Sequence, residues 1–364
     1  MSTITSARRA RTLGFTALAG AAAMMLAGCG TVTPETAAAS GNEEITVTDD
    51  QGREITLDGP AQTAVVLNSY GNEFVRAIGA GDRVVGVDST SLERLPYLGL
   101  SEQDVVSQGL NELNYEAIAE LDPDVVIVPR NAVWEEAATQ LEPFGIPVVV
   151  ATAWDNSVFD DTISLLGEVF GEEAGAQKVK DFHEEISGVI AEGIDGTEAK
   201  PVYLETVDPY LTVLPGSGFH ALIEGAGGEN VFADAGGGDV QEELTVEPAE
   251  VVLRNPALIL HEYDPSAVPV DAARFEATRQ EISARPGWSG IDAVANNQVY
   301  VTSGFATSAL SKSIGALYLA TWLHPEAFAD VNADEYLERW VTEFLDTDFA
   351  GADAYVSLPA GAAQ

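Results

Sequence analysis

Side chains that commonly carry out chemistry are few in this sequence, and they are not grouped. The 364 residues contain one cysteine and four histidines. There is no Gly-x-Ser-x-Gly turn, no His-Glu-x-x-His motif and no P-loop. A Gly-Ser-Gly turn at 216–218 could hold an anion with its backbone N–H groups, but such turns are common ahead of helices. We therefore expect a protein that is not an enzyme and that has no cofactor of its own.

The histidines also argue against a site for a bare metal ion. His183, His220, His261 and His324 all lie in the second half of the chain. A Zn or Mn site shared between two halves of a protein needs ligands from both. We expect the four to be structural, although His220 and His261 could reach a ligand.

The single cysteine ends a short apolar stretch near the start of the chain. Arginines at 8, 9 and 11 precede small and apolar residues at 13–25, and Leu-Ala-Gly-Cys follows at 26–29. Basic charge, a short apolar core and small residues are typical of an export signal. The stretch is too short and too rich in Ala and Gly to span a membrane well. We predict a lipoprotein signal peptide at 1–28, lipid on Cys29 and a flexible tether at 29–44.

The predicted location follows from this segment, and the charge of the chain excludes some partners. We expect an exported protein held by lipid at the outer face of the cytoplasmic membrane. The chain has 58 acidic and 17 basic residues, a formal net charge of −41. So negative a chain is not expected to bind nucleic acid or anionic lipid surfaces. With one cysteine, it cannot form an internal disulfide.

Buried strands and helices alternate along the rest of the chain. Continuous apolar runs at 63–67, 84–87, 125–128 and 147–150 predict parallel strands that are covered on both faces. Helical spacing occurs between them at 73–78 and 115–121, and the same alternation resumes with strands at 202–204, 258–260 and 298–301. A helical region at 156–194, with a break at 171–173, separates the two halves, and a last helix is predicted at 334–344.

The predicted fold is α/β, with two βα lobes built on mostly parallel sheets and joined by a long α-helix. Its predicted parts are a first lobe at 45–154, a connecting helical region at 155–195, a second lobe with its closing helix at 196–346, and a C-terminal tail at 347–364.

Ligands of open α/β sheets bind beyond the carboxyl ends of the strands, so a ligand-binding cleft is expected there, between the lobes. Aromatic rings at these positions offer large rigid contact surfaces, and an arginine could pair with an anionic group of a ligand. Each aromatic residue could instead be ordinary packing. The candidate ligand-binding residues are Ser69, Tyr70, Arg130, Trp134, Trp154, Tyr210, Tyr263 and Phe305.

Eight short motifs carry a resemblance to a known family. From 45 to 344 the chain resembles the substrate-binding proteins of ABC importers for iron-siderophores, haem and cobalamin, which have two lobes and a rigid helix between them. The motifs are VTDDQGR at 47–53, IGAGDRVVGV at 78–87, NYEAI at 114–118, LDPDVVI at 121–127, GGENVF at 227–232, RNP at 254–256, GWSGI at 287–291 and NQVYV at 297–301.

The resemblance implies partners and contact residues. In the family a glutamate on each lobe meets arginines of the membrane permease, and the first-lobe position corresponds to Glu116. The second-lobe position corresponds to Ala249, which departs from the pattern, so that Glu250 or Glu247 would have to supply the charge. The resemblance further implies a monomer that works with an ABC permease and its ATPase.

The resemblance also indicates the class of ligand. It implies a small-molecule metal chelate that carries its own metal, with a ferric siderophore expected first and haem or cobalamin as alternatives. Few basic residues are available for the cleft, which favours a neutral or weakly charged chelate. Two other functions stay open: binding of a bare Zn or Mn ion, and ligand sensing by a lipoprotein that has no importer.

Overall fold

The computed structural model describes residues 43–236, 241–308, 310 and 312–357. The predicted signal peptide, Cys29 and nearly all of the predicted tether lie outside these residues. Within them, no helix has the length and hydropathy needed to cross a membrane.

The first lobe is built on a parallel sheet of five strands in the order β5-β4-β3-β6-β7. Every residue of β3, β6 and β7 is Val, Ile or Ala, and all are buried, as expected when helices cover both faces. An antiparallel hairpin, β1 (Ile45–Thr48) and β2 (Glu54–Leu57), precedes the sheet. The strands are β3 (Ala64–Val66), β4 (Val84–Asp88), β5 (Val105–Ser107), β6 (Val125–Val128) and β7 (Val148–Val150), and the helices are α1 (Ser69–Ala77), α2 (Ser89–Arg94), α3 (Tyr115–Leu121) and α4 (Trp134–Leu141).

The second lobe has a mixed sheet in the order β11-β9-β8-β12-β13, with β10 also paired to β8. The strands β8, β10, β12 and β13 are parallel, whereas β9 and β11 are antiparallel additions at one edge. The strands are β8 (Lys200–Glu205), β9 (Leu211–Val213), β10 (Gly228–Asn230), β11 (Glu243–Thr245), β12 (Leu258–Asp264) and β13 (Val299–Ser303). The helices are α7 (Gly218–Gly225), α8 (Pro248–Arg254), α9 (Ala272–Ser283), α10 (Asp292–Ala295), α11 (Gly304–Ser308), α12 (Ser313–Leu323) and α13 (Ala333–Arg339).

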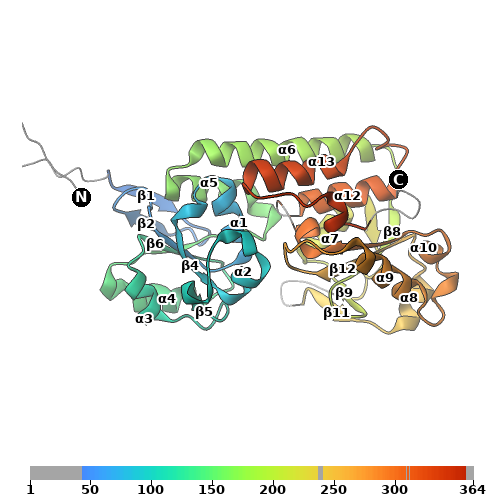
Figure 1. Ribbon diagram of the computed structural model, residues 1–364, viewed down its shortest axis with the longest axis horizontal. Coiled ribbons are helices and arrows are strands. Elements are labelled where there is room, and N and C mark those ends of the chain that lie inside the picture. Colours follow the sequence, from blue (N-terminus) through green and yellow to red (C-terminus); the bar gives the residue numbers. More distant parts are fainter. Residues whose placement is uncertain (1–42, 237–240, 309, 311, 358–364) are drawn as a thin grey trace, which may run out of the picture. The chain divides into compact units, whose positions relative to one another are not determined.

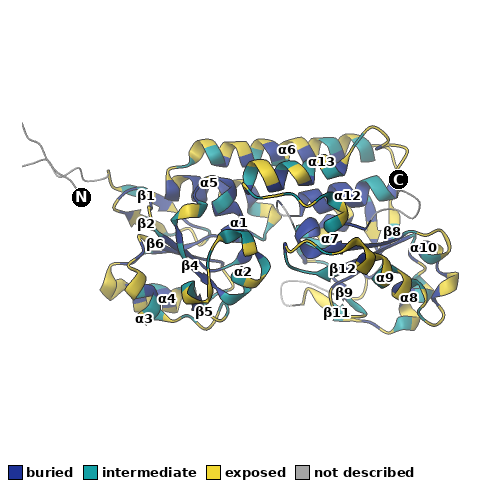
Figure 2. Cartoon of the chain, in the orientation of Figure 1, coloured by how far each residue is buried: buried dark blue, intermediate teal, exposed yellow. Residues whose placement is uncertain are grey.

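Two helices connect the lobes, α5 (Phe159–Phe170) and α6 (Glu173–Ile194) (Figure 1). The predicted break between them occurs at Gly171, which ends α5 with a left-handed φ of 66°. The 22-residue α6 packs against α5 and against α12 of the second lobe. Its apolar stripe is buried and its other face is exposed (Figure 2). The predicted fold of two βα lobes and a long connecting helix is confirmed.

One apolar core extends through both lobes. It joins α1 of the first lobe to α5, α6, α12 and the turn after α13, whereas a separate cluster lies under each sheet. In that turn Trp340 stacks on Phe182 of α6 and meets Phe74 of α1 edge to face, with ring centroids 6.4 and 6.3 Å apart. The lobes are therefore joined by shared packing as well as by chain connections.

Part of the predicted C-terminal tail belongs to the second lobe. Val356 forms an antiparallel bridge with Thr302 of β13, and Ser357 exchanges hydrogen bonds with Val301. Val356 and Tyr355 are buried. The segment continues the sheet beside β13 because that strand is otherwise at an edge with unpaired backbone groups.

Candidate functional site

Two adjoining cavities lie between the lobes, beyond the carboxyl ends of strands from both sheets. Their volumes are about 280 and 760 Å³, and Tyr70, Phe219 and Glu243 line both. We call the two together the cleft. Of the predicted ligand-binding residues, Ser69, Tyr70 and Phe305 line the smaller cavity, and Tyr70, Arg130 and Trp154 line the larger.

The start of α1 positions Tyr70 at the centre of the cleft. The Asn68 side chain caps this helix by accepting hydrogen bonds from the backbone N–H groups of Tyr70 and Gly71, at 3.0 and 3.3 Å. Across the cleft the Tyr70 hydroxyl donates to Ser308 Oγ at 3.3 Å and accepts from Lys312 Nζ at 3.4 Å. Tyr70 therefore links the two lobes as well as lining both cavities.

One turn further along α1, Glu73 places a carboxyl group in the interior between the lobes. Its Oε1 accepts hydrogen bonds from Trp340 Nε1 at 2.8 Å and from the Leu310 backbone N–H at 3.4 Å. Burial raises the pKa of Glu73 to about 7, although these hydrogen bonds and the charge of Lys312 oppose the rise. Near neutral pH this group therefore changes its charge at the junction of the lobes.

Arg130 and Trp154 follow β6 and β7 and form a pair at the edge of the larger cavity. The Arg130 guanidinium carbon lies 4.5 Å from the centroid of the Trp154 ring, and its NH1 lies 2.5 Å from Asp155 Oδ2. Burial alone would raise the pKa of Asp155, but hydrogen bonds from Ser157 and Arg130 outweigh it and lower the pKa. Because Arg130 already has a carboxylate partner, it is less available to an anionic ligand than the sequence suggested.

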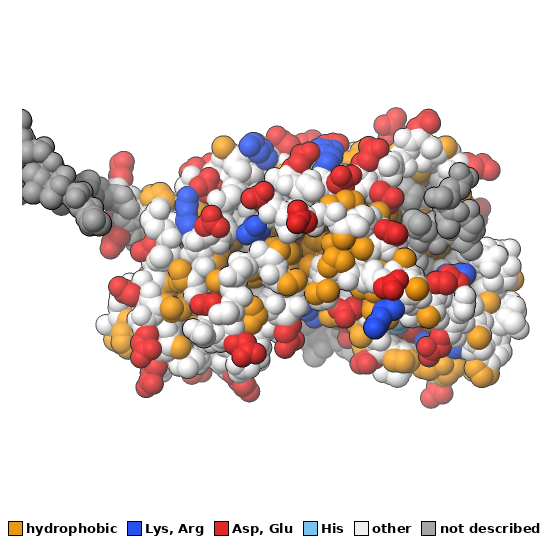
Figure 3. Space-filling view, in the orientation of Figure 1, with side chains coloured by type: hydrophobic (Ala, Val, Ile, Leu, Met, Phe, Trp, Pro, Cys, Tyr) orange, Lys and Arg blue, Asp and Glu red, His pale blue; other side chains and the backbone are white. Residues whose placement is uncertain are grey.

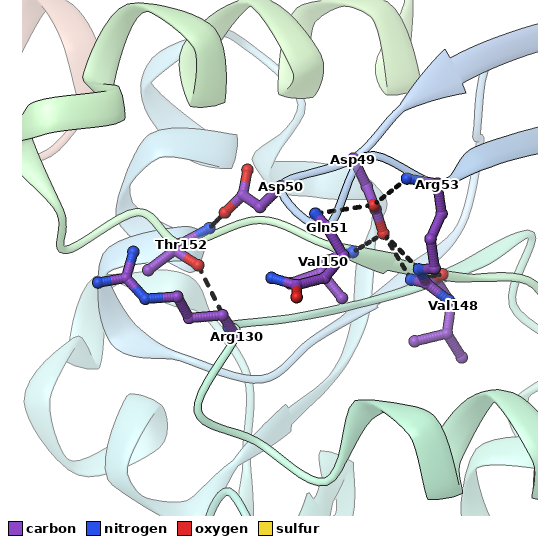
Figure 4. A network of polar contacts seen from close by, with 8 residues as sticks. All are labelled: Asp49, Asp50, Gln51, Arg53, Arg130, Val148, Val150 and Thr152. Carbon is purple, nitrogen blue, oxygen red and sulfur yellow. Dashed lines mark hydrogen bonds and ion pairs between the residues drawn. The ribbon is translucent and has the colours of Figure 1, made fainter.

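A network from the turn between β1 and β2 braces the strand ends that carry this pair (Figure 4). The buried Asp49 carboxylate accepts hydrogen bonds from the backbone N–H groups of Gln51, Arg53 and Val150, and it pairs with the Arg53 side chain at 2.5 Å. Asp50 accepts a hydrogen bond from the Thr152 N–H, and Thr152 Oγ1 accepts one from the Arg130 N–H at 3.2 Å. The VTDDQGR motif thus fixes the ends of β6 and β7.

Three of the predicted residues do not line the cleft, and each has a visible reason. Tyr210 has a left-handed φ of 65°, and its ring packs against Arg285 and Trp288. Tyr263 packs edge to face on Phe275 of α9 at 5.7 Å. Trp134 lies in α4, where its ring stacks on the Arg53 guanidinium at 4.5 Å. All three rings pack against the lobes' own apolar clusters.

Tyr210 is held in this orientation by a buried glutamate at the end of β8. Glu205 forms a two-pronged ion pair with Arg285 at 2.7 and 2.8 Å and accepts the Tyr210 backbone N–H at 2.9 Å. Burial alone would raise the pKa of Glu205, but contacts with His261 and Arg285 prevail and bring it to about 2. This network stabilises the second lobe and leaves no free charge of its own in the cleft.

Most of the charged side chains that line the smaller cavity are acidic, and most of these come from the second lobe. Asp208, Glu243 and Glu262 line it together with Glu73, and Arg94 is the cationic residue in its lining. Acidic side chains are also spread over the face of the molecule seen in Figure 3, where basic ones are few. The cleft therefore suits ligands that are not strongly anionic.

The four histidines all contact protein groups. His183 meets Ser313 Oγ at 2.8 Å and His220 meets Asn230 Nδ2 at 3.2 Å; His324 lies 3.1 Å from the Gly227 carbonyl and His261 lies 3.1 Å from Glu205. In the part of the chain that the structure describes, no three His, Cys, Asp or Glu side chains gather as a metal ion would require.

The two predicted docking glutamates are exposed on short helices of the two lobes. Glu116 lies in the first turn of α3, which Asn114 caps by accepting the Ala117 N–H at 3.1 Å. Glu250 lies in the first turn of α8, with Oε2 4.0 Å from Arg254 Nε. Arg254 pairs more closely with Asp234, at 2.5 Å, so Glu250 is only loosely held.

The cleft residues missed in the sequence include Glu73, Phe219, Glu262 and Lys312. Phe219 and Glu262 had a usable signal, because one opens the helix after the Gly-Ser-Gly turn and the other ends the strand before Tyr263. Glu73 and Lys312 had none. Lys312 is buried with its Nζ 4.9 and 5.1 Å from the ring centroids of Tyr70 and Phe219, a position that only the approach of the two lobes creates.

Comparison with known proteins gives a consistent picture. The family described as "Periplasmic binding protein" matches residues 65–304. A cobalamin-binding protein of Halobacterium salinarum is 31% identical over 246 residues, which are 66% of this chain and 62% of that protein. The chain thus spans less than two thirds of that relative's length.

Two further proteins align over longer stretches. An uncharacterized ABC transporter substrate-binding lipoprotein of Bacillus subtilis, YvrC, is 28% identical over 85% of this chain and 96% of its own length. The structure of the molybdate-binding protein MolA of Haemophilus influenzae, bound to molybdate, covers 84% of this chain and 99% of its own, with a TM-score of 0.68 and 22% identity. The likeness to MolA shows that the two proteins share a fold.

Proposed function

We infer the function from the premise that the chain belongs to the periplasmic binding protein family, whose members bind solutes and are not enzymes. We propose that it is the extracytoplasmic ligand-binding component of an ABC importer. The observation that carries this proposal is the cleft, because it lies beyond the strand ends of two lobes that share a core and takes residues from both. The likeness to the Bacillus subtilis lipoprotein supports it.

The proposed ligand is a metal chelate that brings its own metal. Tyr70, Trp154 and Phe219 offer aromatic surface suited to a large, rigid ligand. The acidic groups of the smaller cavity disfavour ferric catecholates and molybdate, which carry two or more negative charges. A corrinoid such as cobalamin or a ferric hydroxamate siderophore fits better, and the relative named as a cobalamin-binding protein supports the corrinoid.

The ligand proposal is tested by titrating tryptophan fluorescence, since Trp154 lines the larger cavity. The panel is cyanocobalamin, a ferric hydroxamate, a ferric catecholate, haemin, molybdate, Zn²⁺ and Mn²⁺. We expect cyanocobalamin or the hydroxamate to bind with a Kd below about 10 μM. The proposal fails if Zn²⁺ or Mn²⁺ binds in that range while none of the chelates does.

In the proposed mechanism, the protein is attached to the membrane by lipid and docks on its permease through glutamates on α3 and α8. Lipid on Cys29 would keep a monomer close to its permease, and the charge of Glu116 would pair with a permease arginine, with Glu250 or Glu247 acting from the second lobe. The shared core between the lobes favours rocking through a small angle over wide closure. Uptake by cells carrying charge-reversed variants tests the docking step.

A further inference from the structure

One carboxylate that lines the smaller cavity has no partner in the protein. Glu262 lies near the end of β12, between His261 and Tyr263, and it is 9% exposed. Among the described residues, its side chain forms no hydrogen bond and no ion pair. A buried acidic group without a partner is costly and rare, so its presence calls for a reason.

Gly304 has no side chain, and this leaves space for the Glu262 carboxylate. A Cβ at Gly304, the first residue of α11, would lie 2.0 Å from Glu262 Oε1 and 2.7 Å from the Pro265 Cα. Any side chain at 304 would therefore push the carboxylate out of its position. Packing holds the group at the wall of the cavity, with no hydrogen bond to direct it.

The charges around Glu262 do not satisfy it. Arg94 and Lys312 are near enough to lower its pKa, while burial, the largest influence, raises it. Neither cation forms an ion pair with it, and the adjacent His261 is turned to Glu205 at 3.1 Å. Glu243, which lines the same cavity, adds a second negative charge on this side. The group that would complete this site is a hydrogen-bond donor.

We propose that Glu262 is a ligand-recognition residue, which accepts a hydrogen bond from an N–H group at the periphery of the chelate. Peripheral carboxamides of a corrinoid and a pendant ammonium of a ferric hydroxamate are two sources of that donor. A hydrogen bond to a charged group is stronger than one between neutral groups, so Glu262 selects for such donors and repels a carboxylate in the same place. This inference rests on the proposed function and adds the chemistry that the ligand must present.

The test measures Kd for matched ligands on matched variants. The first set of ligands is cyanocobalamin and its monocarboxylic acid isomers, in each of which one peripheral carboxamide has become a carboxylate. The second set is ferrioxamine B and its N-acetylated form, which lacks the ammonium group. The proteins are the full chain, Glu262→Gln and the control Glu281→Gln. Glu281 is an exposed carboxylate on α9 that lines neither cavity.

We expect Glu262→Gln to weaken binding of the preferred chelate by about tenfold or more, and Glu281→Gln to leave it unchanged. We also expect the wild-type chain to discriminate by a similar factor against the carboxylate isomer or the N-acetylated form, and the variant to lose that discrimination. The ligand comparison on wild type stands even if Glu262→Gln folds poorly.

The two proposals fail in different ways. If wild type binds a chelate and Glu262→Gln binds it equally well with the same discrimination, the role of Glu262 is wrong and the proposed function stands. If wild type binds neither cyanocobalamin nor ferrioxamine B, the proposed ligand class is wrong and the role of Glu262 falls with it.

Discussion

At the scale of single residues, burial between the lobes gives Glu73 an unusual titration. An ordinary glutamate is charged at pH 7, but burial holds the pKa of Glu73 at about 7 against the hydrogen bonds from Trp340 and Leu310. Because the folded-state pKa is raised, the protonated form is favoured by folding. Its stabilising contribution is present below the unfolded-state pKa of about 4.5 and is lost as the pH rises through about 7.

Replacing Glu73 with Gln should therefore flatten part of the dependence of stability on pH. The free energy of unfolding of wild type, relative to Glu73→Gln, should fall by about 2.5 kcal/mol between pH 5 and pH 8. Urea unfolding of both proteins at the two pH values measures this. A difference that does not change with pH would show that Glu73 titrates as an exposed carboxyl group.

Some of the ligand-binding residues predicted from strand ends line the cleft, and others do not. Tyr70, Arg130 and Trp154 line the cleft because each follows a buried parallel strand directly. Tyr210 follows β8 too, but the Glu205–Arg285 pair turns its ring into the lobe, and no sequence pattern reveals that pair. Strand ends fix where a residue lies, and packing fixes where its side chain points.

At the scale of elements, α3 and α8 are equivalent helices of the two lobes. Each has seven residues and ends at a left-handed Asp122 or Asn255 followed by proline. Counting from either helix start, Glu116 and Ala249 both occupy the second position, and Glu250 occupies the third. The departure noticed in the sequence is thus reproduced in the structure, with Glu250 one residue further around its helix.

Charge reversal at these helices should separate docking from ligand binding. Glu116→Lys should abolish uptake of the bound chelate and leave its Kd unchanged, because the residue lies outside the cleft lining. Glu250→Lys should have a smaller effect, since its position does not match Glu116. Glu184→Lys on the exposed face of α6 serves as the control. Equal losses of uptake and affinity in Glu116→Lys would refute the docking role.

Elements were predicted well where their apolar runs were continuous. The strands β3, β4, β6, β7, β8, β12 and β13 all overlap the predicted runs, because covered parallel strands need apolar residues on both faces. The two antiparallel strands β9 and β11 were missed because they are three residues long and partly polar. The strand-like pairing of the tail with β13 was missed for the same reason.

At the scale of the whole molecule, the chain combines a shared core with a cleft that is acidic on one side. The core explains why the lobes would move little, and the negative charge explains which ligands the cleft would repel. The segment that includes Cys29, on which membrane attachment depends, lies outside the described residues. The sequence predicted the lobes and their connection, but the polarity of the cleft appeared only when the lobes were brought together.

The central claim is that a chelate binds between the lobes, and the Kd of cyanocobalamin for two phenylalanine variants tests it most directly. Phe219 lines both cavities, whereas Phe144 is 58% exposed on the first lobe and lines neither. Loss of the Phe219 ring should remove contact surface and weaken binding by about tenfold or more, while Phe144→Ala should bind as wild type does. Unchanged affinity in Phe219→Ala, with wild type binding normally, would contradict a site in the cleft.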